Sequence, residues 1–186
     1  MKNITLIVLL SVSMGCGSKR TVVEPSANAY YPVGNYDAKF KYVDTDAYVI
    51  HKDISKQIEW NQIAYSVREI QYSWGKKVET FYRLEDGNVL YYDVASNTES
   101  MIMPKNPKVG FKWVSTDKAW EYEIVQLDGE LETPQRQYSN LLVMKASQVT
   151  GRDSNKLSEY HNYYQKGIGK VASIGDGMLM TFRLYQ

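Results

Sequence analysis

Few side chains in this chain could carry nucleophilic or acid-base chemistry: one cysteine, two histidines and scattered carboxylates. Cys16 is the only thiol, and the thiolate of a cysteine is a strong nucleophile. His51 and His161 are the only side chains whose ordinary pKa suits a general base near neutral pH. A serine hydrolase would also need a strained Gly-x-Ser-x-Gly turn, and the sequence contains none. We therefore interpret both histidines as cross-strand partners, not as catalytic bases.

Metal and paired-acid sites find little support in the spacing of the side chains. A zinc site needs clustered ligands, and the sequence has neither a His-x-x-x-His pattern nor a pair of cysteines. Glu121 and Glu123 are the nearest pair of carboxylates on one strand face, and we interpret them as a solvated face. Two methionine pairs place thioethers at alternate positions, which suits Cu(I), but methionine also fills apolar cores. These pairs are Met101 with Met103 and Met178 with Met180. No catalytic residue, metal ligand or cofactor is therefore assigned.

The segment before Cys16 is typical of a secretory signal peptide. Lys2 is its only charge and precedes the apolar residues 4–12, followed by small residues. The apolar run is too short to cross a bilayer core, which needs about 20 apolar residues. We expect residues 1–15 to be removed, and cleavage by the ordinary signal peptidase stays open as an alternative to lipoprotein processing.

The signal segment ends in Ser13-Met14-Gly15-Cys16, a tetrapeptide that resembles the lipobox of bacterial lipoproteins. Ser13 stands where that family usually has leucine. The resemblance implies that Cys16 is the lipidation site: its sulfur receives a diacylglycerol and its new amino group is acylated, for example with palmitate. Two or three acyl chains make a durable membrane anchor, whereas one chain binds only marginally.

The residues after Cys16 bear on location. Residues 17–20 contain neither the aspartate after the cysteine that retains Gram-negative lipoproteins in the inner membrane nor an acidic run of the surface-displayed kind. The resemblance thus implies that the protein is lipid-anchored at the periplasmic face of the outer membrane. The 22 basic and 21 acidic residues leave a formal net charge of only +1, so nucleic acid is not an expected partner. The expected partners are the membrane, through the anchor, and an envelope protein or lipid ligand.

Composition divides the remaining chain into two parts. Residues 16–35 are rich in turn formers and predict a flexible, lipid-anchored tether. Residues 36–186 predict one all-β domain, because apolar and polar residues alternate and 16 tyrosines suit half-buried sheet surfaces. We expect a single antiparallel β-sandwich or half-open curved barrel of about 9–11 strands. At most one short helix is expected, over residues 53–61, where Ile54 and Ile58 have helical spacing.

Turn signals and apolar runs predict the order of the strands. Residues 77–85 and 88–94 should form a hairpin around Asp86-Gly87, and Asp128-Gly129 is a second hairpin signal. Residues 100–103 should form an edge or bend, since prolines follow. Residues 138–149 contain four consecutive apolar side chains and should be the most buried strand.

Three stretches in the last eighty residues resemble small TapB-like lipoproteins of Gram-negative bacteria. They are Lys108-Val109-Gly110-x-x-Trp113, residues 138–143 (Tyr-Ser-Asn-Leu-Leu-Val) and residues 163–169 (Tyr-Tyr-Gln-Lys-Gly-Ile-Gly). The motifs are strand and turn signatures, and the family brings no agreed activity or catalytic residue. The resemblance implies an all-β lipoprotein and assigns no ligand-binding residue.

The preferred functional hypothesis is a non-enzymatic periplasmic lipoprotein of the outer membrane that binds a protein partner or an apolar or lipid ligand. The alternative is a hydrolase of an envelope polymer that uses the scattered carboxylates. The largest pocket should distinguish them. An apolar, elongated pocket would favour ligand binding, and a cleft with two carboxylates would favour hydrolysis.

Overall fold

The structure is a computed structural model that describes residues 28–149, 153, 155 and 157–185. These residues form twelve β-strands, and none of them is helical. The strands are β1 (Asp37–Tyr42), β2 (Tyr48–Trp60), β3 (Ile63–Tyr72), β4 (Lys77–Glu85), β5 (Asn88–Asp93), β6 (Thr98–Met103), β7 (Lys112–Val114), β8 (Trp120–Glu132), β9 (Gln137–Gln148), β10 (Glu159–Gln165), β11 (Gly169–Gly175) and β12 (Met178–Leu184).

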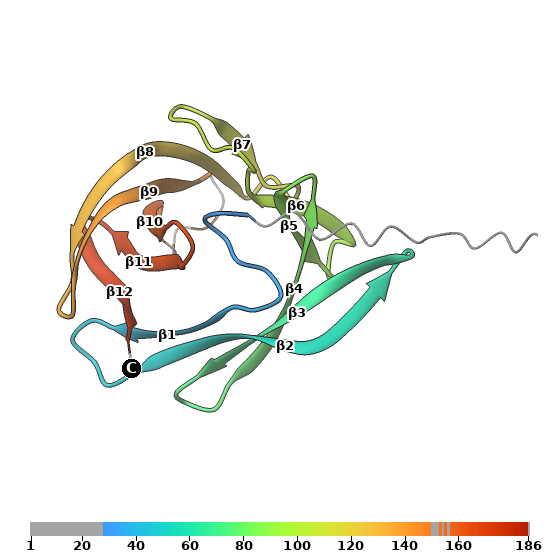
Figure 1. The fold of residues 1–186 in the computed structure, drawn as a ribbon, viewed down its shortest axis with the longest axis horizontal. Coiled ribbons are helices and arrows are strands. Elements are labelled where there is room, and N and C mark those ends of the chain that lie inside the picture. The colour runs from blue at the N-terminus through green and yellow to red at the C-terminus, as the bar shows by residue number, and fades with distance from the viewer. Residues whose placement is uncertain (1–27, 150–152, 154, 156, 186) are drawn as a thin grey trace, which may run out of the picture.

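All twelve strands belong to one antiparallel sheet with the order β6-β5-β4-β3-β2-β1-β12-β11-β10-β9-β8-β7. Strands that follow one another in the chain are neighbours, except across the β6–β7 gap. The first and last strands also pair, with Lys39 opposite Leu184 and Tyr42 opposite Thr181. Figure 1 shows the sheet curled into a nearly closed barrel. The predicted all-β class and curved barrel are confirmed, with twelve strands against the 9–11 expected.

The two edge strands of the sheet, β6 and β7, are not paired with each other through backbone hydrogen bonds. Hydrogen bonds that involve side chains join this seam instead. The indole Nε1 of Trp113 donates to the carbonyl of Met101 at 2.8 Å. The backbone N–H of Thr116 donates to Ser100 Oγ at 2.8 Å, and its hydroxyl donates to the carbonyl of Glu99. The prediction that residues 100–103 form an edge is therefore confirmed.

The one short helix that the sequence allowed over residues 53–61 does not form, because β2 runs through this segment. A bulge after Ile54 inserts two extra residues before pairing resumes at Gln57. Ile54 lies opposite Val67 and Ile58 opposite Tyr65, so both isoleucines share one face of the sheet. The spacing that resembled a helix is the product of this bulge.

The prediction of a hairpin at Asp128-Gly129 is wrong, because β8 continues to Glu132 and the chain turns only at residues 133–136. Gly129 serves close packing. A Cβ there would lie 2.7 Å from Val143 Cγ2 and 3.1 Å from the carbonyl oxygen of Leu141. The hairpin at Asp86-Gly87 is confirmed, with φ angles of 50° and 84° that suit a type I′ turn.

The strand predicted to be most buried, β9, is covered on both faces. Leu141, Leu142, Val143 and Met144 are each at most 3% exposed. Leu142 and Met144 belong to the largest core cluster, while Leu141 packs in a separate cluster with Val171. Such double coverage explains why the alternation of apolar and polar residues disappears there.

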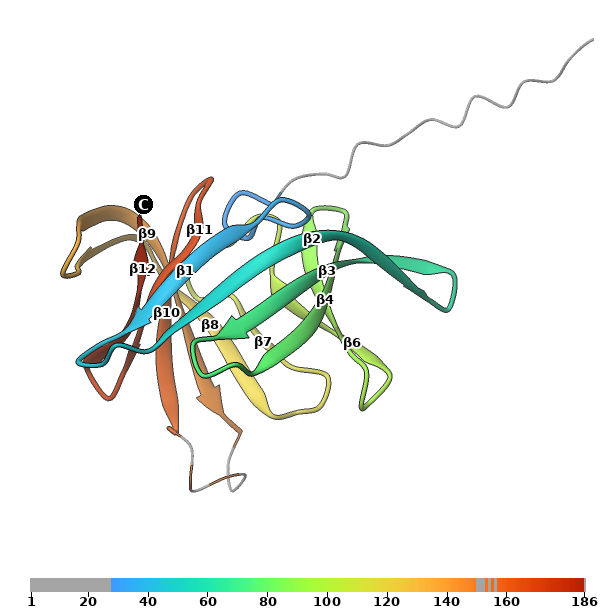
Figure 2. The same cartoon turned by 90° about the horizontal axis from the view of Figure 1, so that it is seen from below.

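Residues 28–35 lie inside one end of the barrel, although the sequence assigns them to the tether (Figures 1 and 2). Asn28 is 7% exposed and holds this segment in place. Its Nδ2 donates to the carbonyls of Gly87 and Pro104 at 3.0 and 3.1 Å, and its Oδ1 accepts from the amides of Tyr30 and Tyr31. The sequence could not show this, because both carbonyls come from distant turns.

Candidate ligand-binding cavity

The barrel interior contains a cavity of about 400 Å³. Its wall includes seven tyrosines together with Phe40 and Val49, and three basic side chains, His51, Arg68 and Lys170. No aspartate or glutamate is among the described residues that line it. The space is therefore aromatic and basic.

Strand alternation places these side chains, because every second residue of a barrel strand points inward. Tyr160, Asn162 and Tyr164, at every second position of β10, all line the cavity. On β2, Val49 and His51 do the same. Inward positions in a barrel of this size are usually apolar, so the basic residues among them need individual explanation.

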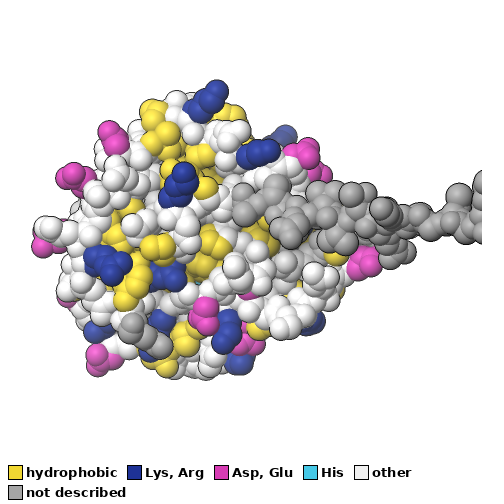
Figure 3. Space-filling view, in the orientation of Figure 1, with side chains coloured by type: hydrophobic (Ala, Val, Ile, Leu, Met, Phe, Trp, Pro, Cys, Tyr) yellow, Lys and Arg dark blue, Asp and Glu magenta, His cyan; other side chains and the backbone are white. Residues whose placement is uncertain are grey.

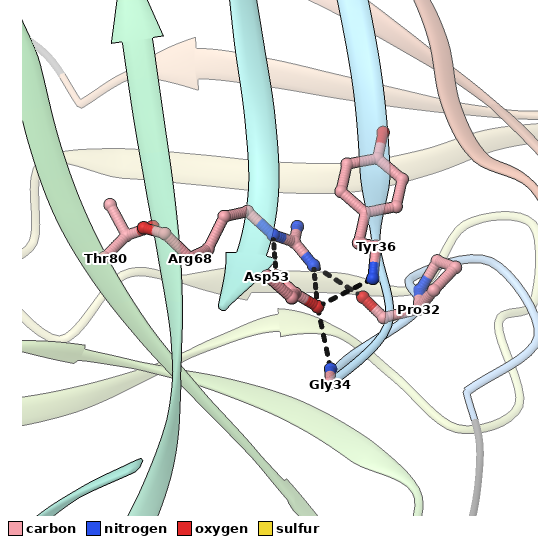
Figure 4. A network of polar contacts seen from close by, with 6 residues as sticks. All are labelled: Pro32, Gly34, Tyr36, Asp53, Arg68 and Thr80. Carbon is pink, nitrogen blue, oxygen red and sulfur yellow. Dashed lines mark hydrogen bonds and ion pairs between the residues drawn. The ribbon is translucent and has the colours of Figure 1, made fainter. Parts of the chain in front are cut away.

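The closed end of the cavity is built around an ion pair between Arg68 on β3 and Asp53 on β2 (Figure 4). Arg68 Nε donates to Asp53 Oδ1 at 2.6 Å, and Nη2 donates to Oδ2 at 3.1 Å. Both side chains are buried, with 3% and 2% of their surface exposed. Nη2 also donates to the carbonyl of Pro32 at 2.7 Å, which ties the pair to residues 28–35.

Asp53 receives two further hydrogen bonds from that segment. The amides of Gly34 and Tyr36 donate to its Oδ2 at 2.7 and 3.0 Å. The carboxylate thus has four donors within the described residues, and its charge is compensated by Arg68. A carboxylate held in this way is a structural clamp, not a catalytic acid.

The guanidinium of Arg68 also lies over tyrosine rings. Its Cζ is 4.2 Å from the ring centroid of Tyr36, 4.9 Å from that of Tyr82 and 5.1 Å from that of Tyr31. These contacts compensate part of the lost hydration of a buried cation. Burial raises the pKa of Tyr36 to about 12, so its hydroxyl is uncharged at neutral pH.

Lys170 on β11 has different surroundings. Its Nζ lies 5.0 Å from the ring centroid of Phe40, and it makes no hydrogen bond or ion pair with any described residue. Burial, with a smaller contribution from the charge of Arg68, lowers the pKa of Lys170 from 10.5 to about 8. The amine is still mostly protonated at neutral pH, so the cavity holds a positive charge that has no acidic partner among the residues described.

The backbone beside Lys170 is pressed against the closing segment. Gly169 has a φ angle of 89°, and a Cβ there would approach Tyr36 Cε2 to 2.8 Å and Pro32 Cδ to 3.0 Å. Only glycine accepts both this conformation and this contact. Lys170 consequently enters the cavity next to its closed end.

His51 lies in the same cavity as a neutral ring. Burial, followed by the charges of Lys170 and Arg68, lowers the pKa of His51 from 6.5 to about 3. Its ring packs edge-on against Phe40 with centroids 5.3 Å apart. No carboxylate lining the cavity is available to orient it as a general base. Across the sheet, His51 pairs with Ala38 and Ile70. The other histidine, His161, pairs with Lys145 and Ile174 and does not line the cavity.

Aromatic and sulfur-containing side chains line the end opposite residues 28–35. Tyr42, Tyr72 and Met180 border the cavity there, and Met180 is 40% exposed. Trp74, which is 59% exposed, contacts the rings of Tyr72 and Tyr42 at centroid distances of 4.7 and 6.1 Å. This end therefore offers apolar surface continuous with the interior.

The other residues singled out in the sequence do not join this cavity. Glu123 forms ion pairs with Lys112 and Lys145, each with an N–O distance of 3.3 Å. A register shift puts Met101 opposite Leu90 and Met103 opposite Val89, so this methionine pair does not share one face. Met178 is 69% exposed, away from the cavity wall. Within the described part of the chain, no cluster of three or more His, Cys, Asp or Glu side chains is placed to hold a metal ion.

Cys16 and the predicted signal segment, residues 1–15, lie outside the described residues, as does the predicted tether as far as residue 27. The described part of the chain contains no helix long and apolar enough to cross a membrane. Lys170 is not among the site residues predicted from the sequence. The sequence feature that could have indicated it is the position of this one lysine among the small and buried residues Gly169, Val171 and Ala172.

Charges on the face shown in Figure 3 form no patch of one sign. Figure 3 shows basic and acidic side chains interspersed over the face that it presents, in keeping with the near-neutral composition. No protein-family model, curated protein or solved structure matches this chain.

Proposed function

We propose that this protein is an exported, lipid-anchored binding protein that holds a small amphiphilic ligand inside its barrel without transforming it. The observation that carries the proposal is the aromatic cavity of about 400 Å³. This volume lies within the range of ordinary ligand pockets, about 300–1,000 Å³. A closed end built from residues 28–35 and an aromatic opposite end suit a ligand that enters lengthwise.

The cavity supports binding over hydrolysis. Paired-acid hydrolysis of an envelope polymer requires two carboxylates facing one substrate, and the described residues lining this cavity include none. Asp53, the nearest buried acid, is occupied by Arg68 and two backbone amides. Tyrosine rings bury apolar surface, worth about 25 cal/mol per Å², while their hydroxyls orient polar groups.

Ligand binding is tested with phenylnaphthylamine, a neutral dye that fluoresces in apolar surroundings. We expect saturable binding to the purified protein. Thr181→Trp should reduce the affinity at least about tenfold, because Thr181 lines the cavity and a large ring would fill it. Met178→Trp, on the exposed start of the same strand, is the matched control and should leave binding unchanged. Equal binding by both variants would place the dye outside the cavity and contradict the proposal.

The anchor is tested separately at Cys16. Cys16→Ser should release the protein from the membrane fraction and abolish incorporation of labelled palmitate, because serine lacks the thiol that accepts the lipid. Processed Cys16→Ser protein that still sedimented with membranes would contradict the lipid anchor at the outer membrane.

A further inference from the structure

The charges that face the cavity do not balance. Arg68 is neutralised by Asp53, and His51 is an uncharged ring at neutral pH. Lys170 is the remaining cation, and no described acid contacts it. An ammonium group that lines a largely aromatic cavity beside a phenyl ring has lost part of its hydration, which is unfavourable without an anionic partner. Among the described residues, the cavity therefore has one positive charge without an acidic partner.

We propose that the ligand is a monoanionic amphiphile, an organic carboxylate with an apolar body, whose head group forms an ion pair with Lys170. This inference rests on the proposed function and specifies its ligand. The carboxylate would lie next to the closed end, since Lys170 follows Gly169, which packs against Tyr36 and Pro32. The apolar body would extend past Phe40 toward Tyr72 and Met180 at the opposite end.

The count of charges favours a monoanion over a dianion such as a phosphate monoester. A single carboxylate cancels the one excess charge of Lys170. A dianion would leave a negative charge unpaired in the same low-dielectric space, because Arg68 already serves Asp53. The seven tyrosines add hydroxyl groups that can form hydrogen bonds but no further positive charge.

The test compares pyrenebutyric acid with its methyl ester, two fluorescent probes that share the same apolar body but of which only the acid has a charged head group at neutral pH. The purified protein should bind the acid at least about tenfold more tightly than the ester, as expected for a buried charge-assisted pair. Lys170→Met should bring the two affinities within about twofold of each other by weakening the acid alone. Lys166→Met is the matched control, because Lys166 lies at the exposed tip of the preceding turn. It should leave both affinities unchanged.

Each outcome has a distinct meaning. If the wild-type protein binds acid and ester equally, the carboxylate inference is wrong but the cavity still binds amphiphiles. If Lys170→Met weakens both probes to the same extent, Lys170 shapes the cavity and does not recognise a head group. If neither pyrene probe nor phenylnaphthylamine binds, the proposed function fails as well. Thermal melting verifies that Lys170→Met is folded, and Lys170→Gln replaces it should it not fold.

Discussion

Arg68 and Lys170 are both basic side chains inside the same barrel, yet their surroundings differ. Arg68 has a buried carboxylate, a backbone carbonyl and three tyrosine rings around its guanidinium. Lys170 has the face of Phe40 and no acid. Arg68 holds residues 28–35 against the barrel wall, whereas Lys170 faces the cavity. The difference separates a structural charge from one that is available to a ligand.

The chemistry of the two side chains fits this division. A guanidinium binds a carboxylate through two parallel hydrogen bonds with fixed geometry, which suits a permanent clamp. An ammonium on a flexible chain is a point charge whose pKa responds readily to its surroundings. Four predictions break or sharpen the contrast, beginning with the largest expected effect.

Removing the partner of Arg68 should be severe. Asp53→Ala leaves a buried guanidinium uncompensated and removes the acceptor of the Gly34 and Tyr36 amides. We expect a loss of about 3–5 kcal/mol in the free energy of unfolding, measured by urea denaturation. The double variant Asp53→Leu with Arg68→Met should recover much of this loss, since it leaves no unpaired charge. A loss below about 1 kcal/mol for Asp53→Ala would show that Arg68 is not a clamp.

Removing the charge of Lys170 should have the opposite sign. At pH 7 both the folded and the unfolded chain hold this proton, so the wild type bears the full burial penalty and Lys170→Met should be more stable. Between the folded pKa of about 8 and the ordinary value of 10.5, the folded state releases its proton first. The stability of the wild type should then rise with pH relative to the variant, by about 3 kcal/mol at most.

Denaturation series at pH 7 to 10.5 measure this difference, with Lys166→Met as the control that should show none. The groups that act on Lys170 are charged Arg68 and neutral His51, and neither changes its charge in this range. If Lys170→Met were less stable than the wild type at pH 7, the amine would have a partner within the protein and the contrast with Arg68 would fail.

Asn28 tests the closing segment without touching either cation. Asn28→Ala removes four hydrogen bonds, two to the carbonyls of Gly87 and Pro104 and two from the amides of Tyr30 and Tyr31. We expect a loss of about 1–3 kcal/mol, together with faster hydrogen exchange at both tyrosine amides. Unchanged exchange would mean that the Arg68–Asp53 pair holds the segment by itself.

The smallest effect is expected at the exposed turn between β10 and β11. Lys166→Ala should change stability by less than about half a kcal/mol, because the side chain is exposed and unpaired among the described residues. Gly167→Val in the same turn should cost about 1 kcal/mol or more, since its φ angle is 78°. If Lys166→Ala abolished probe binding without altering thermal melting, the functional lysine would lie in the turn and not in the cavity.

Local signals predicted the strands and one turn well. Alternating residues 36–42 and 77–85 became β1 and β4, and Asp86-Gly87 became the hairpin between β4 and β5, because these features depend on neighbouring residues alone. The local pattern misleads at residues 53–61, where the sequence left a helix open, and at Asp128-Gly129, where it predicted a hairpin. A bulge overrides it at the first place and a close contact from another strand at the second.

The amino-acid sequence by itself determined the all-β class, the near-neutral surface and the burial of β9, since each follows from composition or from residue periodicity. The tertiary structure was needed for the site. Arg68 meets Asp53 because β2 and β3 pair around a bulge, and Lys170 meets Phe40 because β1 closes the sheet against β12. Periodicity assigns a lysine to the inward face, but which acids face it is decided by strands far away in the chain. An unpaired charge becomes visible only when all the walls of the cavity are in place.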